Sequence, residues 1–279
     1  MLKLGIVGRG ISYSLSPLIH KKAMRILGIT GDYEIFDRDE AELEDFVRHC
    51  AKTEMRGLNI TTPYKEIVMK ICTEVSDTAA KTGAVNTLVF NSGTIRGENT
   101  DLFGFEKALR ELVGARQLPC AIILGSGGVA RAVLSVLSSW PTVQEILVVA
   151  RQREAAQQKL ASLTAGQYTD FYSFADPRLA TTISRASLIV NCTMVGTTAC
   201  PGLALPWVEN LSASTAVMDL IYAPTKTELL AAAERVGCSW QNGLEMLLHQ
   251  AAASFNIWTG KSFPLREVRA VLYKEVAAS

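Results

Sequence analysis

The sequence predicts an α/β protein built as two domains, each with a mostly parallel sheet, and a cleft between them. Two observations support this. Short apolar runs alternate with amphipathic helical segments over the first hundred residues. Further on, the four apolar residues 121–124 lead directly into a glycine-rich turn, which is followed by a run of helix formers. That second pattern is typical of a buried strand, a tight turn and the start of a helix in a Rossmann-like domain.

The elements of the first hundred residues follow from periodicity and turn signals. A helix is expected where Pro17 begins a run ending at residue 27, because proline suits a first helical position. A second helix has Leu43, Phe46 and Val47 on one side. Asn91-Ser92-Gly93 predicts a hairpin turn. The expected strands are 2–7, 33–36, 58–60, 87–90 and 94–97, and the expected helices are 17–27 and 40–52.

Composition excludes several classes of function. The chain has 279 residues, of which 48% are hydrophobic and 20% charged, so it can bury a large core. Its net charge is +1, and no global field favours a nucleic acid or an acidic membrane surface. A small anionic ligand would have to be held by local groups. We therefore expect neither a nucleic acid nor a membrane as partner.

Cysteine and histidine usage points to a reduced, metal-free protein. None of the six cysteines forms a Cys-x-x-Cys pair, which favours the cytoplasm over a disulfide framework. The three histidines (20, 49 and 249) show no metal-ligand spacing. Met1 leads directly into a strand without a signal peptide, and no apolar run is long enough to span a bilayer.

Three polar clusters follow predicted strands, where ligands of parallel sheets collect. In the first, Ser14 and Ser16 could hold a carboxylate, although one of them could simply cap the following helix. In the second, Asn59, Thr61 and Lys65 could converge on a polyol, although lysine is usually a solvated surface residue.

The third cluster joins residues 84–87 to residues 97–101. Asp101 could cap the helix expected over 102–112, and Asn86 could be an ordinary turn residue. Each conventional interpretation is adequate alone. The occurrence of all three clusters in this order, ahead of the glycine turn, favours a binding site.

The glycine turn predicts a dinucleotide site. Gly125 permits the tight turn, Gly127 lets a ligand approach the backbone, and Ala130 keeps helix and strand close. A lone G-x-G-x-x-A also occurs in plain connections, but here it lies between strand and helix. The helix N-terminus would face a pyrophosphate.

After the strand 146–150 comes the position that selects between the two nicotinamide cofactors. An acidic residue there favours NAD, whereas an arginine accommodates the 2′-phosphate of NADP. Arg151 occupies it, and Glu145 precedes the strand at the wrong end. Arg151 therefore favours NADP, the alternative being a surface arginine that opens a helix. Further expected elements are the strands 187–192 and 216–220, the helices 244–258 and 265–276, and an ordinary loop around Gly166.

Taken together, these pieces resemble the shikimate dehydrogenase family nearly end to end. The matching pieces are residues 14–17, 59–65, 84–87, 99–101, the glycine turn, 191–196, 219–224 and 243–250. The resemblance implies NADP-dependent, reversible reduction of 3-dehydroshikimate to shikimate. It makes Lys65 and Asp101 the catalytic pair, with the role of Lys65 as proton donor or electrostatic clamp left open.

The same resemblance implies the remaining site residues. Ser14, Ser16 and Tyr222 would bind the substrate carboxylate, and Asn59, Thr61, Asn86, Asp101 and Gln250 the ring hydroxyls. The cofactor would contact Gly125, Ser126, Gly127, Gly128, Val129, Ala130, Arg151, Thr193, Met194, Leu220, Gly243 and Met246. The substrate domain would comprise residues 1–101 joined by the C-terminal helices 243–279, and the cofactor domain residues 102–242. The partner would be a cyclic hydroxy acid, and the protein a monomer or homodimer.

Two departures from the family pattern leave alternatives open. Gly10 and Tyr13 stand where the family commonly has proline and histidine, which suggests quinate or an amino analogue of shikimate as substrate. Ala150 and Gln152 lack polar groups that the family usually has beside Arg151, so use of NAD is open.

Two other functions are alternatives to this enzyme. A non-catalytic binding or regulatory protein with the same fold would be expected to lack Lys65 or Asp101, and both are present. A methylenetetrahydrofolate dehydrogenase would not need the serine pair or Gln250.

Overall fold

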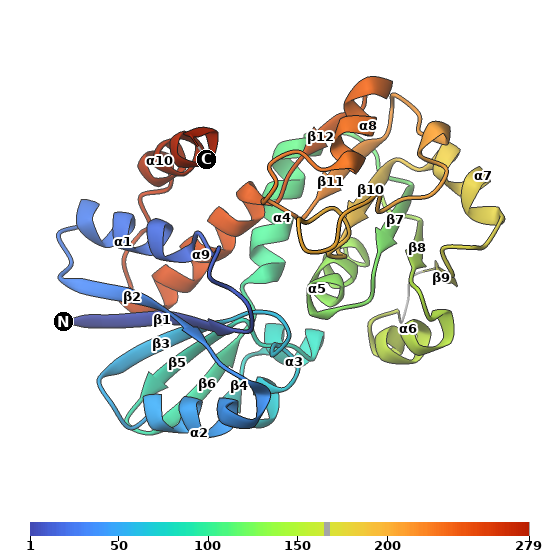
Figure 1. Ribbon diagram of the computed structural model, residues 1–279. Helices are drawn as coiled ribbons and strands as arrows, with labels where there is room; N and C mark the ends of the chain where they lie inside the picture. Colours follow the sequence, from blue (N-terminus) through green and yellow to red (C-terminus); the bar gives the residue numbers. More distant parts are fainter. Residues whose placement is uncertain (165–167, 279) are drawn as a thin grey trace. The chain divides into compact units, whose positions relative to one another are not determined.

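The computed structural model describes residues 1–164 and 168–278, and it divides into two compact units (Figure 1). The first unit contains residues 1–104 and those from 247 onward, and the second contains residues 105–246. Two six-stranded sheets, one in each unit, confirm the predicted α/β class. The loop predicted around Gly166 lies outside the described residues. Among the helices that are described, none is long and apolar enough to cross a membrane.

The first unit is built on a mixed sheet in the order β2-β1-β3-β5-β6-β4. Strands β1, β2 and β3 run parallel, while β5 pairs antiparallel with both β3 and β6. Its elements are β1 (Leu2–Gly8), α1 (Ser16–Ile26), β2 (Gly31–Asp37), α2 (Glu40–Cys50), β3 (Met55–Ile60), β4 (Glu74–Val75), α3 (Asp77–Thr82), β5 (Thr87–Asn91), β6 (Thr94–Glu98), the start of α4 (Asp101–Val113), the end of α9 (Leu244–Thr259) and α10 (Leu265–Ala278).

The two faces of this sheet are covered differently. Leu58 and Ile60 of β3 pack into an apolar cluster with Leu43 and Val47 of α2. Because side chains alternate along a strand, Asn59 points to the opposite face. On that face Asn59 contacts residues of β2, β5 and α9. Asn59 is therefore a candidate residue of the functional site.

Local signals explain where several helices begin and end. Asp39 and Glu42 form a capping box at the start of α2. Helix α3, which periodicity did not predict, is capped by Ser76 and ends at Gly83 with φ +62°. The predicted hairpin is present, with Ser92 (φ +48°) and Gly93 (φ +87°) in its turn.

The second unit is a doubly wound parallel sheet in the order β12-β11-β10-β7-β8-β9. From β7 the chain runs outward through β8 and β9, then returns to the other side of β7 for β10, β11 and β12. Its elements are β7 (Cys120–Leu124), α5 (Gly128–Leu137), β8 (Glu145–Val149), α6 (Arg153–Leu160), β9 (Tyr168–Tyr172), α7 (Arg178–Arg185), β10 (Leu188–Asn191), β11 (Ala216–Asp219), α8 (Glu228–Val236) and β12 (Ser239–Gln241).

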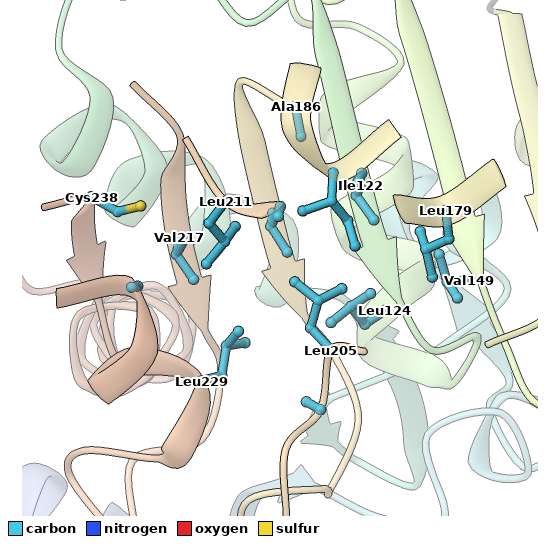
Figure 2. Packing of buried hydrophobic residues seen from close by; sticks show 14 of the residues in the cluster. Ile122, Leu124, Val149, Leu179, Ala186, Leu205, Leu211, Val217, Leu229 and Cys238 are labelled. Carbon is cyan, nitrogen blue, oxygen red and sulfur yellow. The ribbon is translucent and has the colours of Figure 1, made fainter. Parts of the chain in front are cut away.

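The core of this unit is an apolar layer between strands and helices (Figure 2). Ile122, Leu124 and Val217 come from central strands, and Leu179 and Leu229 come from α7 and α8. All are almost completely buried, and full burial of such side chains stabilises a fold by about 1.5–3 kcal/mol each. This packing fixes the carboxyl ends of the strands, where the loops that follow gather.

Candidate functional site

Lys65 and Asp101 form a shielded ion pair in the first unit. The Nζ atom of Lys65 lies 2.7 Å from Oδ2 of Asp101, and the two side chains are 17% and 5% exposed. Lys65 follows β3 after a turn that contains a cis Thr62–Pro63 bond, and its carbonyl accepts the N–H of Val85 at 2.8 Å. Asp101 is the first residue of α4, where the helix dipole favours a negative charge.

Asn86 orients the carboxylate of Asp101 from the other side. Its Oδ1 accepts the backbone N–H of Thr100 at 2.8 Å, so its Nδ2 must face the remaining acceptors. Those acceptors are Oδ1 of Asp101 at 2.8 Å and Oγ1 of Thr100 at 2.9 Å. Asp101 thus accepts a hydrogen bond at each carboxylate oxygen, from Lys65 at Oδ2 and from Asn86 at Oδ1. These two bonds fix the orientation of its carboxylate.

Asn59 belongs to a buried polar network behind this pair. Its Nδ2 lies within 3.2 Å of the Asn86 carbonyl and of the hydroxyls of Thr87 and Ser254, and its Oδ1 accepts from Tyr33 at 2.7 Å. Asn59 is 4% exposed and its polar atoms already have protein partners. The network lies behind the Lys65–Asp101 pair and does not present Asn59 to solvent.

The sequence did not single out Tyr33, Thr100 or Ser254. Ser254 lies four residues after Gln250 on α9, so helical spacing places both on one face. Its hydroxyl donates to the Gln250 carbonyl at 3.0 Å and lies 3.1 Å from Oγ1 of Thr100. The i, i+4 spacing from Gln250 could have identified Ser254 from the sequence. The partners of Ser254 on other elements could not be predicted.

The predicted carboxylate-binding serines lie at the start of α1. Ser16 is its first residue and is 3% exposed, and its N–H is 3.3 Å from Oγ of Ser14. Burial raises the pKa of Tyr33, whose hydroxyl donates to Asn59 at 2.7 Å, well above its ordinary value. Thr61 is half-buried and leads into the Lys65 turn, and Nε2 of Gln250 donates to the Leu247 carbonyl at 2.8 Å.

In the second unit, the glycine turn connects β7 to α5. Gly125 has φ +99°, a conformation that favours glycine, and its N–H donates to the Val149 carbonyl at 2.7 Å. Gly127 precedes α5, and an added Cβ there would meet no described atom within 4 Å. Gly128 begins the helix. Ser126 and Val129 are half-buried, whereas Ala130 is fully buried. The arrangement offers an open helix N-terminus to an anion.

Arg151 follows β8 at the edge of the same sheet. It is exposed, and Arg153 begins α6 two residues later. The next strand ends at Tyr172, whose ring lies beneath the guanidinium of Arg178 at 4.2 Å, and Arg178 is paired with Asp176. Arg151 and Arg153 therefore place two cationic side chains just after the end of β8.

The remaining predicted cofactor residues follow β10, β11 and β12. Thr193 and Met194 follow β10 after Cys192, and Met194 is 52% exposed. Leu220 follows β11, and a Cβ on Gly243 would lie 2.1 Å from its carbonyl oxygen. Only glycine fits at 243. Tyr222 is half-buried and Met246 is buried on α9, and both belong to this second unit.

Comparison with known proteins gives a consistent result over nearly the whole chain. Residues 6–88 match a family model described as the shikimate dehydrogenase substrate binding domain, and residues 243–273 match the shikimate 5'-dehydrogenase C-terminal domain. A shikimate dehydrogenase (NADP(+)) of Chlorobium phaeobacteroides is 36% identical over 289 residues, covering 99% of this chain and 97% of the relative.

Two solved structures show the same architecture. Shikimate 5-dehydrogenase from Thermus thermophilus, in complex with NADP(H) and shikimate, is 31% identical with a TM-score of 0.87, covering 98% of this chain and 99% of the other. Quinate dehydrogenase from Corynebacterium glutamicum, in complex with NAD, is 29% identical with a TM-score of 0.88 and the same coverage.

Proposed function

The chain belongs to the shikimate dehydrogenase family, and we propose that it catalyses the reversible, NADP-dependent reduction of 3-dehydroshikimate to shikimate. The observation that carries this proposal is the shielded Lys65–Asp101 pair, with 2.7 Å between Nζ and Oδ2. An isolated ammonium in that position would be costly to shield from water, so the carboxylate makes the arrangement stable. A paired, positively charged lysine beside a substrate carbonyl is suited to stabilise a developing alkoxide.

Lys65 has the chemistry that the reduction requires. As the carbonyl oxygen gains negative charge, the ammonium of Lys65 stabilises it and can release a proton to it. Asp101 holds the ammonium in place through Oδ2, while Asn86 fixes the carboxylate through Oδ1. In the oxidative direction the same lysine, once deprotonated, accepts the proton of the substrate hydroxyl.

We carry the remaining substrate contacts over from the family resemblance. Ser14 and Ser16 would bind the carboxylate together with Tyr222, and Thr61, Asn86, Asp101 and Gln250 the ring hydroxyls. For Asn59 we propose a positioning role instead, because its amide is used by Tyr33, Thr87, Ser254 and the Asn86 backbone and, unlike that of Asn86, it makes no hydrogen bond to Asp101.

The residues of the second unit fit a pyridine dinucleotide. Gly125 has the positive φ that the turn needs, the space over Gly127 is open, and α5 begins directly after it. When bound, NADPH supplies the hydride for the carbonyl carbon. Residues 125–130 would hold the pyrophosphate, and Arg151 the 2′-phosphate. Thr193, Met194, Leu220, Gly243 and Met246 would line the remaining part of the cofactor site.

The proposal extends to the organisation and location of the protein. Residues 1–101 with 243–279 would form the substrate domain, and residues 102–242 the cofactor domain. All six cysteines are free, which supports a reducing compartment such as the cytoplasm. The expectation of a monomer or homodimer stays a prediction, and light scattering after size-exclusion chromatography would decide it.

A second candidate function is oxidation of quinate or an amino analogue of shikimate, with NAD as an alternative cofactor. Two observations support this second function. Tyr13, next to Ser14, is 57% exposed, and Gly10 has φ +66° with no described atom near an added Cβ. A quinate dehydrogenase that binds NAD is also among the similar structures.

An absorbance assay at the nicotinamide band separates these functions. The expected result is a higher kcat/KM for shikimate with NADP+ than for quinate or with NAD+. A higher value for quinate would establish the second candidate, and no reduction of either cofactor would refute both.

Lys65→Met is expected to lower kcat at least about a hundredfold with little change in KM. A variant with near-normal turnover would remove Lys65 from the chemistry.

A further inference from the structure

Asp219, at the end of β11, is a completely buried carboxylate with neutral partners. Its Oδ1 accepts from Nδ2 of Asn191 at 3.0 Å and from the N–H of Ile221 at 3.1 Å, and its Oδ2 accepts from the Thr227 hydroxyl at 2.6 Å. Burial raises the pKa of Asp219, and these three hydrogen bonds oppose that rise. The buried carboxylate therefore joins β10, β11 and the first turn of α8.

Asn191 carries this connection into the turn that follows β10. Its Oδ1 accepts the N–H of Thr193 at 3.0 Å and its hydroxyl at 2.7 Å, while its Nδ2 also donates to the Val195 carbonyl at 3.2 Å. Because Nδ2 is shared between Asp219 and Val195, the amide cannot flip without losing the bonds at both ends. Asp219 thereby sets the orientation of Asn191, and Asn191 shapes the turn over residues 193–196.

This turn lies against two fixed points. A Cβ added to Gly125 would be 3.0 Å from Cγ2 of Thr193, and one added to Gly196 would be 3.2 Å from Cβ of Thr227. Gly196 has φ +113°. The turn over residues 193–196 thus packs between the glycine turn after β7 and Thr227, which caps α8. Thr227 donates to Asp219 directly, and Thr193 is connected to Asp219 through Asn191.

The position of the turn in the sheet indicates which part of a dinucleotide it meets. Strands β7 and β10 are neighbours, and the chain leaves them in opposite directions. Ligands of doubly wound sheets bind outside the carboxyl ends of the strands at this point. Arg151, after β8, lies on the half that takes the adenosine. The turn after β10 lies on the other half.

We propose that Asp219 is a positioning residue for the nicotinamide half of the cofactor site, acting through Asn191 and Thr227 on the turn over residues 193–196. This assignment rests on the proposed function, because it presupposes that the second unit binds NADP(H). It predicts that loss of the carboxylate weakens the nicotinamide half of the site and leaves the adenosine half intact.

The test compares two ligands on the full-length protein. NADPH occupies both halves, whereas adenosine 2′,5′-bisphosphate occupies only the adenosine half. In Asp219→Asn, the Thr227 hydroxyl loses its acceptor while the side chain keeps its shape. The dissociation constant for NADPH, measured by fluorescence, is expected to rise about tenfold, because small misplacements are costly in oriented sites. That for adenosine 2′,5′-bisphosphate, measured by calorimetry, should stay within about twofold.

Thr215→Val is the matched control. Thr215 is also completely buried in the second unit, and its hydroxyl donates to the Ala186 carbonyl at 2.8 Å. It should lose stability without a change in either dissociation constant. Should Asp219→Asn not fold, Thr227→Val and Thr227→Ser provide the same comparison, since serine keeps the hydroxyl and should restore NADPH affinity.

The outcomes are distinct. Unchanged NADPH affinity, or an equal loss for both ligands, overturns the role of Asp219 while the proposed function stands. A wild-type protein that binds neither ligand overturns the proposed function and this assignment together. A selective loss of NADPH affinity that Thr215→Val does not reproduce supports the assignment.

Discussion

His20 should make the stability of the first unit fall steeply at acidic pH. The residue is fully buried on α1, its ring is stacked on Tyr33 at 4.4 Å, and among the described residues neither ring nitrogen has a hydrogen-bond partner. Burial lowers the pKa of His20 to about 3, against a smaller raising effect of Asn59, which lies outside hydrogen-bonding geometry. The folded state therefore keeps the ring neutral where the unfolded chain would protonate it.

The sign and size of the effect follow from the two pKa values. Well above pH 6.5 the ring is neutral in both states, so this contribution to stability is complete. As pH falls towards 3, only the unfolded state gains the proton, and the contribution is lost at about 1.4 kcal/mol per pH unit. Between pH 7.5 and 4.5 the loss is about 2.7 kcal/mol.

Replacing His20 with leucine removes this titration while keeping an apolar side chain of similar volume. The free energy of unfolding of both proteins would be measured by urea denaturation, followed by circular dichroism, at pH 7.5 and 4.5. Other groups titrate equally in both proteins, so the variant should lose about 2.7 kcal/mol less than the wild type. Equal losses would refute the reasoning, because they would show that the folded state protonates His20 as readily as the unfolded chain does.

Three further predictions concern the two proposed binding regions. Asp101→Asn should lower kcat about a hundredfold in steady-state assays, because Lys65 loses its charged partner at 2.7 Å; retained turnover would show that the carboxylate is not needed. Arg151→Ala should raise KM for NADP+ about tenfold and leave KM for NAD+ unchanged, and parallel changes would mean that Arg151 does not contact the 2′-phosphate. Gly243→Ala should destabilise the protein by about 3 kcal/mol in a thermal or urea melt, because its Cβ would lie 2.1 Å from the Leu220 carbonyl oxygen; a melt like that of the wild type would mean the backbone can shift there.

The fold was predictable where local signals were strong. The glycine turn, the hairpin over residues 91–93 and the apolar runs of β7, β8 and β10 all follow from patterns within a few residues. The helices and strands that were not predicted are β4, α3, α6, β9, α7, α8 and β12. Strand β9 reads Tyr-Thr-Asp-Phe-Tyr and only Phe171 is fully buried, because it forms the edge of the sheet and one side needs no apolar residues.

The site divides in the same way. Lys65, Asn86 and Asp101 stand in motifs that resemblance could identify, and the structure brings all three together. The partners that hold them could not be predicted. Ser254 reaches Asn59 across 195 residues of sequence, and no local pattern specifies such a pairing. The isolation of His20 is likewise a tertiary property, because it depends on rings contributed by Tyr33 and Trp258.

The two buried aspartates show how environment separates the carboxylate that we propose for catalysis from the one that we propose to position a turn. Asp101 faces an ammonium and begins a helix, so a negative charge on it is stabilised beside the lysine that we propose to act on the substrate. The donors to Asp219 are an amide, a backbone N–H and a hydroxyl, so its charge is tolerated only through hydrogen bonds. Asp219 has no cationic partner that could take part in a reaction. Its carboxylate instead fixes the orientation of three hydrogen-bond donors. The turn over residues 193–196 would need such fixed directions to orient the cofactor that we propose it binds.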